Sequence, residues 1–434
     1  MDPQPLKPGD RIEVTIEKGI YGGLGLARHR GQVVLVPRAF RGDRGRVVVE
    51  SVTRGFARAV LEDLAAPAAE RRRSPCPYSD RCGGCSYQEI GYDEQLGLKE
   101  AILRETLQRG GVAWEGEIPV AGSPEAGWRT RATLHFRSRE GQLALGFHRA
   151  ATHEVVDIET CLQMSSAMNR AARSLLDGLG RSPGLWPKLR HLELAESGDG
   201  QELVALVDAR LEPAEAAALA ALRDGTPWLT GLGALAGQEP RRFVSLGGAP
   251  HVHNTVAGLR LRSHVRSFFQ GNRFRVGDLV GQVLSLVPAG GTLLDLYAGV
   301  GLFALPLAAR AERVLGAEIN RTAVEDARAN IEAAGCRNVR LVQGDVAEAL
   351  ASWRPEKGER IVLDPPRTGA GPEVVAAVAA RGPEAVVYVS CDPPTLARDL
   401  AAFRRAGYEA DALRAFDLFP DTAHLEAVVR LRPR

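Results

Sequence analysis

Two groups of residues in this 434-residue chain have types and spacings that suit chemistry. The first centres on Cys391, which follows an apolar, mostly β-branched run at residues 385–389. Two prolines at 393 and 394 cannot continue a strand ladder, so Cys391 is predicted at the carboxyl end of a buried strand. Residues 395–400 predict the start of a helix, whose positive end favours a thiolate. Cys391 is therefore a candidate nucleophile, although a lone cysteine at a strand end is more often a small buried apolar residue.

The second group is Cys76, Cys82 and Cys85, three thiols within ten residues that also contain a proline and paired glycines. A chain of this length with six cysteines has too few for a disulfide scaffold, and this clustering predicts a metal centre. Cys161, the next cysteine in the chain, completes a set of four soft ligands. Four thiolates suit either a tetrahedral zinc ion or a 4Fe-4S cluster, and their spacing leaves both open. Gaps of five and two residues disfavour a radical S-adenosylmethionine enzyme.

Strict alternation of strands and helices surrounds Cys391 and predicts a doubly wound α/β domain. Its strands are predicted at residues 292–296, 314–317, 339–342, 361–363 and 385–389. Gly299 and Gly301 follow the first strand and permit a close backbone turn at a cofactor. Glu318, at the tip of the second strand, is placed to bind ribose hydroxyls. Asp345 and Asp364 follow the third and fourth strands, so acidic and thiol groups share one edge of the sheet.

The glycine loop and the fourth strand narrow the predicted chemistry to methyl transfer. The loop has no third glycine at dinucleotide spacing and is preceded by Asp295, which favours S-adenosylmethionine over a nicotinamide cofactor. Asp364-Pro365-Pro366 is followed by Arg367, where amino-group methyltransferases carry an aromatic residue, so the target is predicted not to be an amine. A pyrimidine carbon is a poor nucleophile and requires covalent activation, which a thiolate such as Cys391 supplies.

The first 75 residues concentrate the positive charge, with 14 Lys and Arg against 9 Asp and Glu, in a chain whose net charge is +2. Short β-type runs at 11–16, 32–36 and 46–52, separated by glycine-rich turns, predict a small β-barrel of the OB type that binds nucleic acid. An ordinary solvated basic surface is the alternative. Residues 65–73 are predicted to be a linker. The arginines on this predicted barrel are Arg28, Arg30, Arg38, Arg41, Arg44, Arg46, Arg54 and Arg58.

The middle of the chain carries a predicted helix at 92–108 that packs on another domain, and a hairpin of residues 133–139 and 142–147 around Glu140-Gly141. The hairpin is rich in arginine and histidine, which suits either a second RNA-facing sheet or a solvated charged face. The predicted domains are residues 1–66, 67–260 and 261–434. With no apolar run near the roughly 20 residues that span a bilayer and no signal-peptide layout, we expect a cytoplasmic protein.

Taken together, these motifs resemble the RNA uracil-5 methyltransferases over nearly the whole chain. The resemblance is carried by the four cysteines, Asp364-Pro365-Pro366-Arg367, residues 390–393 and His424-Leu425-Glu426. The branch that fits best has an N-terminal TRAM domain and a 4Fe-4S cluster and methylates 23S rRNA. It implies an OB-like TRAM barrel, a central α+β iron-sulfur domain and a C-terminal Rossmann-like S-adenosylmethionine methyltransferase domain, in a monomer. A tRNA uracil-5 methyltransferase, or a non-catalytic RNA-binding iron-sulfur protein, is the alternative.

The resemblance also implies residue roles. Cys391 adds to carbon 6 of a flipped-out uridine, and Glu426 removes the carbon 5 proton. Leu302 stands where relatives often carry Asn, which removes one cofactor contact, and Asp392 stands where Asn is common. A carboxylate beside Cys391 opposes thiolate formation unless it is paired or turned away. The implied S-adenosylmethionine ligands are Gln270, Tyr297, Gly299, Glu318, Asp345 and Asp364, and the implied cluster ligands are Cys76, Cys82, Cys85 and Cys161.

Overall fold

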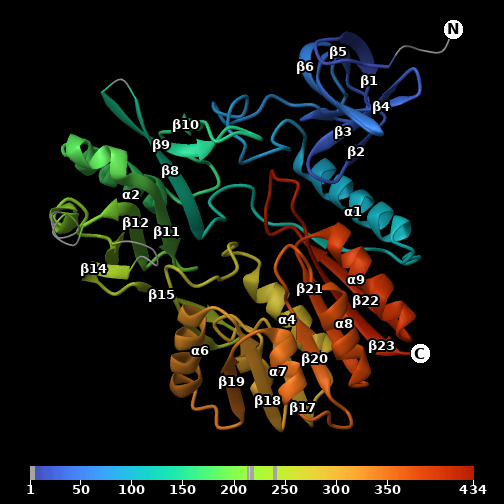
Figure 1. Ribbon diagram of the computed structural model, residues 1–434, viewed down its shortest axis with the longest axis vertical. Helices are drawn as coiled ribbons and strands as arrows, with labels where there is room; N and C mark the ends of the chain where they lie inside the picture. The colour runs from blue at the N-terminus through green and yellow to red at the C-terminus, as the bar shows by residue number, and fades with distance from the viewer. Residues whose placement is uncertain (1–4, 140, 213–214, 216–218, 238–241) are drawn as a thin grey trace.

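The computed structural model describes residues 5–139, 141–212, 215, 219–237 and 242–434 (Figure 1). The strands of these residues form sheets of six, seven, two and eight strands. In Figure 1 the N-terminal barrel lies at the upper right, the central sheet at the left and the C-terminal sheet at the lower right. No described helix is long and apolar enough to cross a membrane.

Residues 11–66 form the N-terminal barrel, whose strands are ordered β1-β5-β6-β4-β3-β2. In β1, buried Ile12 and Val14 alternate with exposed neighbours, which is the period-two pattern of a strand with one face in a core. The sheet curls so that β1 also contacts β3. The strands are β1 (Arg11–Thr15), β2 (Lys18–Ile20), β3 (Leu24–His29), β4 (Gln32–Pro37), β5 (Arg44–Thr53) and β6 (Phe56–Ala66).

The predicted linker at residues 65–73 is wrong. Strand β6 continues to Ala66, and the segment after it is tied to the barrel by Asp43, a carboxylate that is only 1% exposed. Asp43 accepts hydrogen bonds from the backbone of Phe40 at 2.7 Å and Ala68 at 2.8 Å, and it pairs with Arg71 at 3.3 Å. A buried carboxylate with three donors fixes the chain that passes over it.

The central sheet has the order β10-β9-β8-β11-β12-β13-β14 and is covered by α2 (Ser166–Gly180). The predicted hairpin is confirmed as β8 and β9, although Glu140 in its turn lies outside the described residues. A separate hairpin, β15 (His251–Val256) and β16 (Leu259–His264), leads into the C-terminal part. The strands of the central sheet are β8 (Arg131–Arg139), β9 (Gln142–His148), β10 (Val155–Asp157), β11 (Leu189–Glu196), β12 (Leu203–Leu211), β13 (Gly231–Ala236) and β14 (Arg242–Gly248).

The C-terminal sheet has the order β19-β18-β17-β20-β21-β23-β22-β7 and confirms the predicted doubly wound fold. The five predicted strands are all present and parallel, and β23 pairs antiparallel with β21. Its strands are β17 (Thr292–Leu296), β18 (Arg313–Glu318), β19 (Val339–Gln343), β20 (Arg360–Leu363), β21 (Ala385–Ser390), β22 (Tyr408–Phe416), β23 (Glu426–Pro433) and β7 (Val120–Ala121). Its helices are α4 (Val276–Leu286), α5 (Ala304–Ala308), α6 (Arg321–Ala333), α7 (Val346–Ser352), α8 (Gly371–Ala380) and α9 (Pro393–Arg405).

Both faces of this sheet are buried, which explains why its strands are continuous apolar runs. In β21, Val386 and Tyr388 face one core together with side chains of α7, α8 and α9. Val387 and Val389 face the other core, with side chains of α4, α5 and α6. Because neither face is available to solvent, polar side chains gather at the strand ends, where they can be used.

Helix α1 (Tyr92–Arg109) and strand β7 join the C-terminal sheet, although they precede the central sheet in the chain. Leu103 and Leu107 of α1 share a core with α9, and β7 pairs parallel with β22 at the sheet edge. The helix thus packs on another part of the chain, as expected, and Figure 1 shows it between the barrel and α9. The predicted domain ranges remain a prediction, but residues 92–121 share the core of the C-terminal sheet.

Candidate active site

The carboxyl ends of the five parallel strands meet at one edge of the C-terminal sheet. This edge carries Tyr297 after β17, Glu318 at the end of β18 and Asp345 after β19. Asp364 follows β20, and Cys391 follows β21. The structure therefore brings together five of the predicted site residues, which come from the ends of five different strands.

The predicted cofactor loop turns sharply between β17 and α5. Tyr297 has φ 69°, and Gly299 and Gly301 have φ 55° and 91°, which only glycine adopts freely. Glu318 ties this loop to β18: its Oε2 accepts from the Gly299 amide at 2.9 Å, and its Oε1 accepts from the Asn320 amide at 2.6 Å. Each oxygen of Glu318 keeps a lone pair for a ligand hydroxyl.

The remaining predicted cofactor residues are placed differently. Asp345 is the N-cap of α7, and its Oδ1 accepts from the amides of Ala347 at 2.7 Å and Glu348 at 3.3 Å. This capping bond leaves Oδ2 available. Gln270 is 4% exposed in the loop that precedes α4. Leu302 is buried in the core beside α5 and α6, so it offers no polar group to the site.

Cys391 and Glu426 are neighbours because of strand register. In the antiparallel pair of β21 and β23, Ser390 lies opposite Ala427. Cys391, which follows β21, therefore lies beside Glu426, the first residue of β23. Burial raises the pKa of Cys391 to about 12, and the nearby charge of Glu426 adds to this shift, while Arg367 opposes it. The thiol and the carboxyl are thus close enough to influence each other's ionisation.

A second carboxyl, that of Asp364, lies near Glu426, so the two groups influence each other's protonation. Burial and the charge of Glu318 raise the pKa of Asp364 to about 7. Glu426 is 2% exposed, and burial followed by the charge of Asp364 raises its pKa well above the ordinary range for a carboxyl. Once deprotonated, such a carboxylate is a stronger base than one in water. The corner can therefore hold or accept a proton beside a thiol.

Arg367 and His424 close this corner from the side. The Nη2 atom of Arg367 lies 3.2 Å from Nε2 of His424. Burial and the charge of Arg367 lower the pKa of His424 to about 4, so the imidazole is neutral at physiological pH and accepts from the guanidinium. Arg367 is thereby held as a positive group near the thiol and the two carboxyls.

Asp392, the residue flagged beside the nucleophile, is paired. It is the N-cap of α9, and its Oδ1 accepts from the Thr395 amide at 3.0 Å and from Thr395 Oγ1 at 2.9 Å. Its Oδ2 accepts from the hydroxyl of Tyr21, a residue of the N-terminal barrel. Both carboxylate oxygens are occupied, which meets the condition under which Asp392 is compatible with a thiolate at the neighbouring position.

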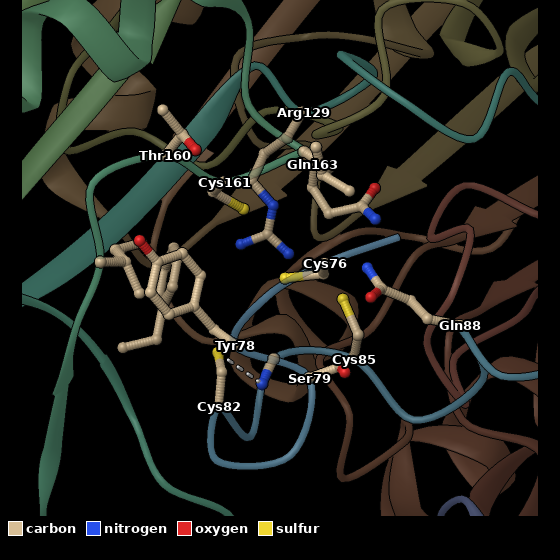
Figure 2. Close-up of a pocket in the computed structure, with 14 residues that line it drawn as sticks. Cys76, Tyr78, Ser79, Cys82, Cys85, Gln88, Arg129, Thr160, Cys161 and Gln163 are labelled. Carbon is tan, nitrogen blue, oxygen red and sulfur yellow. Dashed lines mark hydrogen bonds between the residues drawn. The ribbon is translucent and has the colours of Figure 1, made fainter. Parts of the chain in front are cut away.

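The four predicted metal ligands line one cavity of about 50 Å³. Figure 2 shows the side chains of Cys76, Cys82, Cys85 and Cys161 around a common space into which the guanidinium of Arg129 also points. The first three lie on a loop whose Gly83 amide donates to the His148 carbonyl at 2.9 Å. The fourth is held by Asn169 of α2, whose Oδ1 accepts from its amide at 2.7 Å.

This cavity fits a soft, negatively charged metal group. All four thiols are free, and thiolates prefer zinc or iron-sulfur clusters. Nε of Arg129 and Oε1 of Gln163, two residues of the lining, are buried with no hydrogen-bond partner among the described residues. The orphaned guanidinium nitrogen suits an anionic neighbour. Among all the residues that the structure describes, no group of three or more His, Cys, Asp or Glu side chains lies in an arrangement that could hold a metal ion.

Comparison with known families identifies the fold and the chemistry of this edge. The family described as tRNA (uracil-5-)-methyltransferase matches residues 91–434, and the TRAM domain family matches residues 5–61. The chain belongs to the tRNA (uracil-5-)-methyltransferase family. It is accordingly an RNA uracil-C5 methyltransferase that uses S-adenosylmethionine, and the predicted reaction class and fold class are confirmed.

Relatives of this uracil-5 methyltransferase span its whole length. A 23S rRNA (uracil(1939)-C(5))-methyltransferase RlmD from Pectobacterium atrosepticum is 32% identical over 97% of this chain and 93% of its own. An RNA methyltransferase of uncharacterised function from Halalkalibacterium halodurans is 29% identical, with 98% of both chains covered. The crystal structure of Pyrococcus abyssi tRNA (uracil-54, C5)-methyltransferase with S-adenosyl-L-homocysteine has a TM-score of 0.74, with 26% identity over 96% of this chain and 100% of that one.

Three features of this uracil-5 methyltransferase were missed by sequence reasoning. Tyr21 was noted only as part of a glycine-rich turn, and nothing in the sequence links it to Asp392. Arg129 was one of many arginines in a basic stretch, whereas the structure places it in the cysteine cavity. Ile319 is 69% exposed beside Glu318, and an apolar side chain that fills no core at the cofactor edge suits a stacked base.

Proposed function

We propose that this uracil-5 methyltransferase modifies a uridine of 23S rRNA through a covalent bond between Cys391 and the base, with Glu426 as the general base. The observation that supports this most is the register of β21 and β23, which sets Glu426 beside Cys391 at the cofactor edge. Cys391 can then attack one ring carbon, while Glu426 removes the proton from the adjacent ring carbon.

We further propose that S-adenosylmethionine binds along the carboxyl edge of the sheet. The free lone pairs of Glu318 suit ribose hydroxyls, and Oδ2 of Asp345 suits an amino group of the base, with Ile319 against the ring face. The glycines at 299 and 301 permit close approach of the backbone. The cofactor supplies an electrophilic methyl group on a sulfonium. Tyr297, Gln270 and Asp364 complete the proposed cofactor and uracil pocket.

In the proposed reaction, the thiolate of Cys391 adds to carbon 6 of the flipped-out uracil, and the electrons of the carbon 5–carbon 6 double bond move into an enolate. Carbon 5 then attacks the methyl carbon, and the carbon–sulfur bond of the sulfonium breaks with its electrons on sulfur. The carboxylate of Glu426 takes the carbon 5 proton. The electrons of that carbon–hydrogen bond restore the double bond and expel the Cys391 thiolate.

Arg367 and the N-terminus of α9 favour the charged nucleophile in this scheme. The guanidinium lowers the pKa of Cys391, against the effect of burial and of the carboxyls. Burial raises the pKa values of Asp364 and Glu426, so both carboxyls hold a proton more readily than carboxyls in water do. A neutral carboxyl opposes a thiolate less than a charged one does, so proton sharing at this corner eases the first step.

The decisive experiment compares Cys391→Ala with Glu426→Gln on target RNA with labelled S-adenosylmethionine. Cys391→Ala is expected to lose methylation and to form no covalent complex, because carbon 5 never becomes nucleophilic. Glu426→Gln is expected to add and to transfer the methyl group, and then to stall. Its labelled methyl group should therefore migrate with a protein–RNA band on a denaturing gel.

Cys336→Ala, at a half-buried cysteine outside the active-site edge, is the matched control for thiol removal. It is expected to methylate RNA normally. Methylation by Cys391→Ala would refute the covalent mechanism. Normal turnover by Glu426→Gln, or loss of all activity without a trapped band, would refute the role of Glu426 as the base.

The choice of 23S rRNA rests on the relative named for that substrate, which is 32% identical over nearly the full length. The alternative, a tRNA substrate, is supported by the Pyrococcus abyssi structure, which matches the whole chain at 26% identity. Methylation rates on a 23S rRNA fragment and on a tRNA transcript, measured with the purified chain, separate the two. Preference for tRNA would overturn the 23S assignment and leave the chemistry intact.

We also propose that Cys76, Cys82, Cys85 and Cys161 hold a 4Fe-4S cluster. Four free thiols around one cavity and the buried, unpartnered Nε of Arg129 support an anionic thiolate-bound metal group, and the choice of 4Fe-4S over zinc follows the family resemblance. Protein purified without oxygen is expected to contain about four iron and four sulfide ions, and to show a brown charge-transfer absorption. Stoichiometric zinc without iron would contradict the assignment. Cys161→Ser should lose the absorption, whereas Cys336→Ser should keep it.

A further inference from the structure

The N-terminal barrel reaches the active-site corner through strand β2 and the turn that follows it. Lys18 pairs with Glu105 of α1 at 2.5 Å, and Gly19 lies so close to Leu98 that a Cβ would approach its Cδ1 to 2.6 Å. Gly23, with φ +77°, lies against Ser86, where a Cβ would come within 2.8 Å of the side chain. Glycines at these points let the barrel dock closely.

This docking carries the side chain of Tyr21 to the loop that holds the nucleophile. Its hydroxyl donates to Oδ2 of Asp392, a residue 371 positions away in the chain. The other oxygen, Oδ1, accepts from Thr395 in the first turn of α9. The carboxylate of Asp392 is thus held from two sides, by the barrel and by the helix.

The position of Asp392 matters because it directly follows Cys391. Asp392 is one of three carboxyls near the thiol, and its negative charge disfavours the thiolate, as do those of Glu426 and Asp364. A hydrogen bond from the Tyr21 hydroxyl to Oδ2 draws the charge of the Asp392 carboxylate away from the sulfur. Without Tyr21, Oδ2 would be free to turn toward Cys391.

We infer that Tyr21 is a positioning residue for the nucleophile: by holding Asp392 against the N-terminus of α9, it keeps the carboxylate beside Cys391 from suppressing attack by the thiol. The inference rests on the proposed role of Cys391. It gives the barrel a part in the chemical step in addition to binding RNA, because a single hydrogen bond joins the barrel to the reacting loop.

The test measures the reactivity of Cys391 itself, without RNA or cofactor. The rate of its alkylation by iodoacetamide is followed by mass spectrometry of the Cys391 peptide in wild type, Tyr21→Phe, Asp392→Asn and the double variant. Tyr21→Phe is expected to react about three- to tenfold more slowly at neutral pH, equivalent to a rise of half to one unit in the pKa of the thiol. Asp392→Asn should react at least as fast as wild type, and Tyr21→Phe should have no further effect in that background.

Lys18→Gln is the matched control, because it removes another barrel contact without touching Asp392. It should alkylate at the wild-type rate. In methylation assays, Tyr21→Phe is expected to lower kcat and leave KM for RNA unchanged. A wild-type alkylation rate for Tyr21→Phe, an equal loss in the Asp392→Asn background, or an equal loss in Lys18→Gln would each overturn the inference. The covalent mechanism is tested separately, because its failure would appear as methylation by Cys391→Ala and not as a change in the alkylation rates.

Discussion

Asp295 is a buried carboxyl at the cofactor edge, and its protonation changes on folding. It is fully buried at the end of β17, where Oδ2 accepts from the Ala304 amide at 2.8 Å and Oδ1 has no partner among the described residues. Burial, with the charges of Asp364 and Glu318, raises the pKa of Asp295 to about 8. The folded protein therefore prefers the protonated form, and the unfolded chain does not.

The pH dependence of stability follows from this shift. Because the pKa of Asp295 is raised on folding, its contribution is most favourable below about pH 4 and is lost as the pH rises to about 8. Asp295→Asn keeps an oxygen for the Ala304 amide and removes the titration. We expect the variant to match wild type below about pH 4 and to exceed it by a few kcal/mol above pH 8, in urea unfolding measured from about pH 3.5 to 9.

A difference between variant and wild type that stays constant with pH would contradict this account. Exposed Asp278 of α4 provides the control, and Asp278→Asn is expected to leave the pH profile unchanged. The comparison isolates Asp295 from Asp364 and Glu426, which titrate in both proteins.

Local sequence identified Cys391 as a catalytic candidate but did not place Glu426 beside it, for a physical reason. Cys391 was recognised because a β-branched run before it and prolines after it mark a strand end locally. Glu426 was named as the base only through the family resemblance, because its position beside the thiol depends on antiparallel pairing of β23 with β21. The partners of Asp392 and the orphaned Nε of Arg129 depend on contacts between distant segments, which no local pattern encodes.

At the scale of elements, the hairpin of β15 and β16 is fastened to α6 by Asp326 and by Asn330, whose side chain bonds to the backbone N–H and carbonyl of Arg262. Asp326 is 1% exposed, and its Oδ1 lies 3.0 Å from Nε of Arg262. Its Oδ2 accepts from the His264 amide at 2.7 Å and from Ser267 Oγ at 2.6 Å. Since the chain continues from Ser267 to Gln270, Asp326 sets the start of the loop that carries a proposed cofactor residue.

Asp326→Ala is expected to destabilise the protein by about 3 kcal/mol, because it leaves buried donors unpaired. It should also raise KM for S-adenosylmethionine, as the loop to Gln270 loses its anchor. Glu325→Ala removes the neighbouring carboxylate, which is exposed and pairs only with Arg321 four residues away, and should change stability by less than about 0.5 kcal/mol. Equal effects of the two variants in thermal unfolding would show that Asp326 is not an anchor.

The elements themselves were predicted where burial on both faces makes a continuous apolar run, as in the five parallel strands. The prediction failed where an element depends on its partner. The end of strand β6 was taken for part of a linker because its last residues are alanines. Strand β7 is only two residues long and forms because it pairs with β22. Such short or weakly patterned strands are decided by the sheet that receives them.

At the scale of the whole molecule, the barrel surface is the expected RNA contact. Among the nine arginines of residues 11–66, Arg11, Arg28, Arg38 and Arg46 form ion pairs with glutamates. The arginines that are exposed and have no ion pair among those found are Arg30, Arg41, Arg44, Arg54 and Arg58. These five are free to meet phosphates, so they are the residues on which the salt dependence of RNA binding should rest.

Arg41, Arg44 and Arg54 changed together to Gln should weaken RNA binding and reduce the slope of log K against log salt by about 0.7 for each lost phosphate contact. Arg321 and Arg328, exposed on α6, changed to Gln serve as the control and should leave the slope unaltered. Filter binding at several salt concentrations measures both. An unchanged slope in the barrel variant would show that this surface does not touch RNA.

The placement of α1 and β7 in the C-terminal sheet has a consequence for synthesis on the ribosome. Both segments are made before the central sheet, whereas α9, β22 and β23, which receive them, are made after it. At roughly 5–20 residues per second, the apolar side chains of Leu103, Leu107 and Ile118 wait for tens of seconds without a core. The nascent chain must therefore carry the apolar face of α1 exposed while the central sheet is made. The core around α1 and β7 is complete only after α9, β22 and β23 have been synthesised.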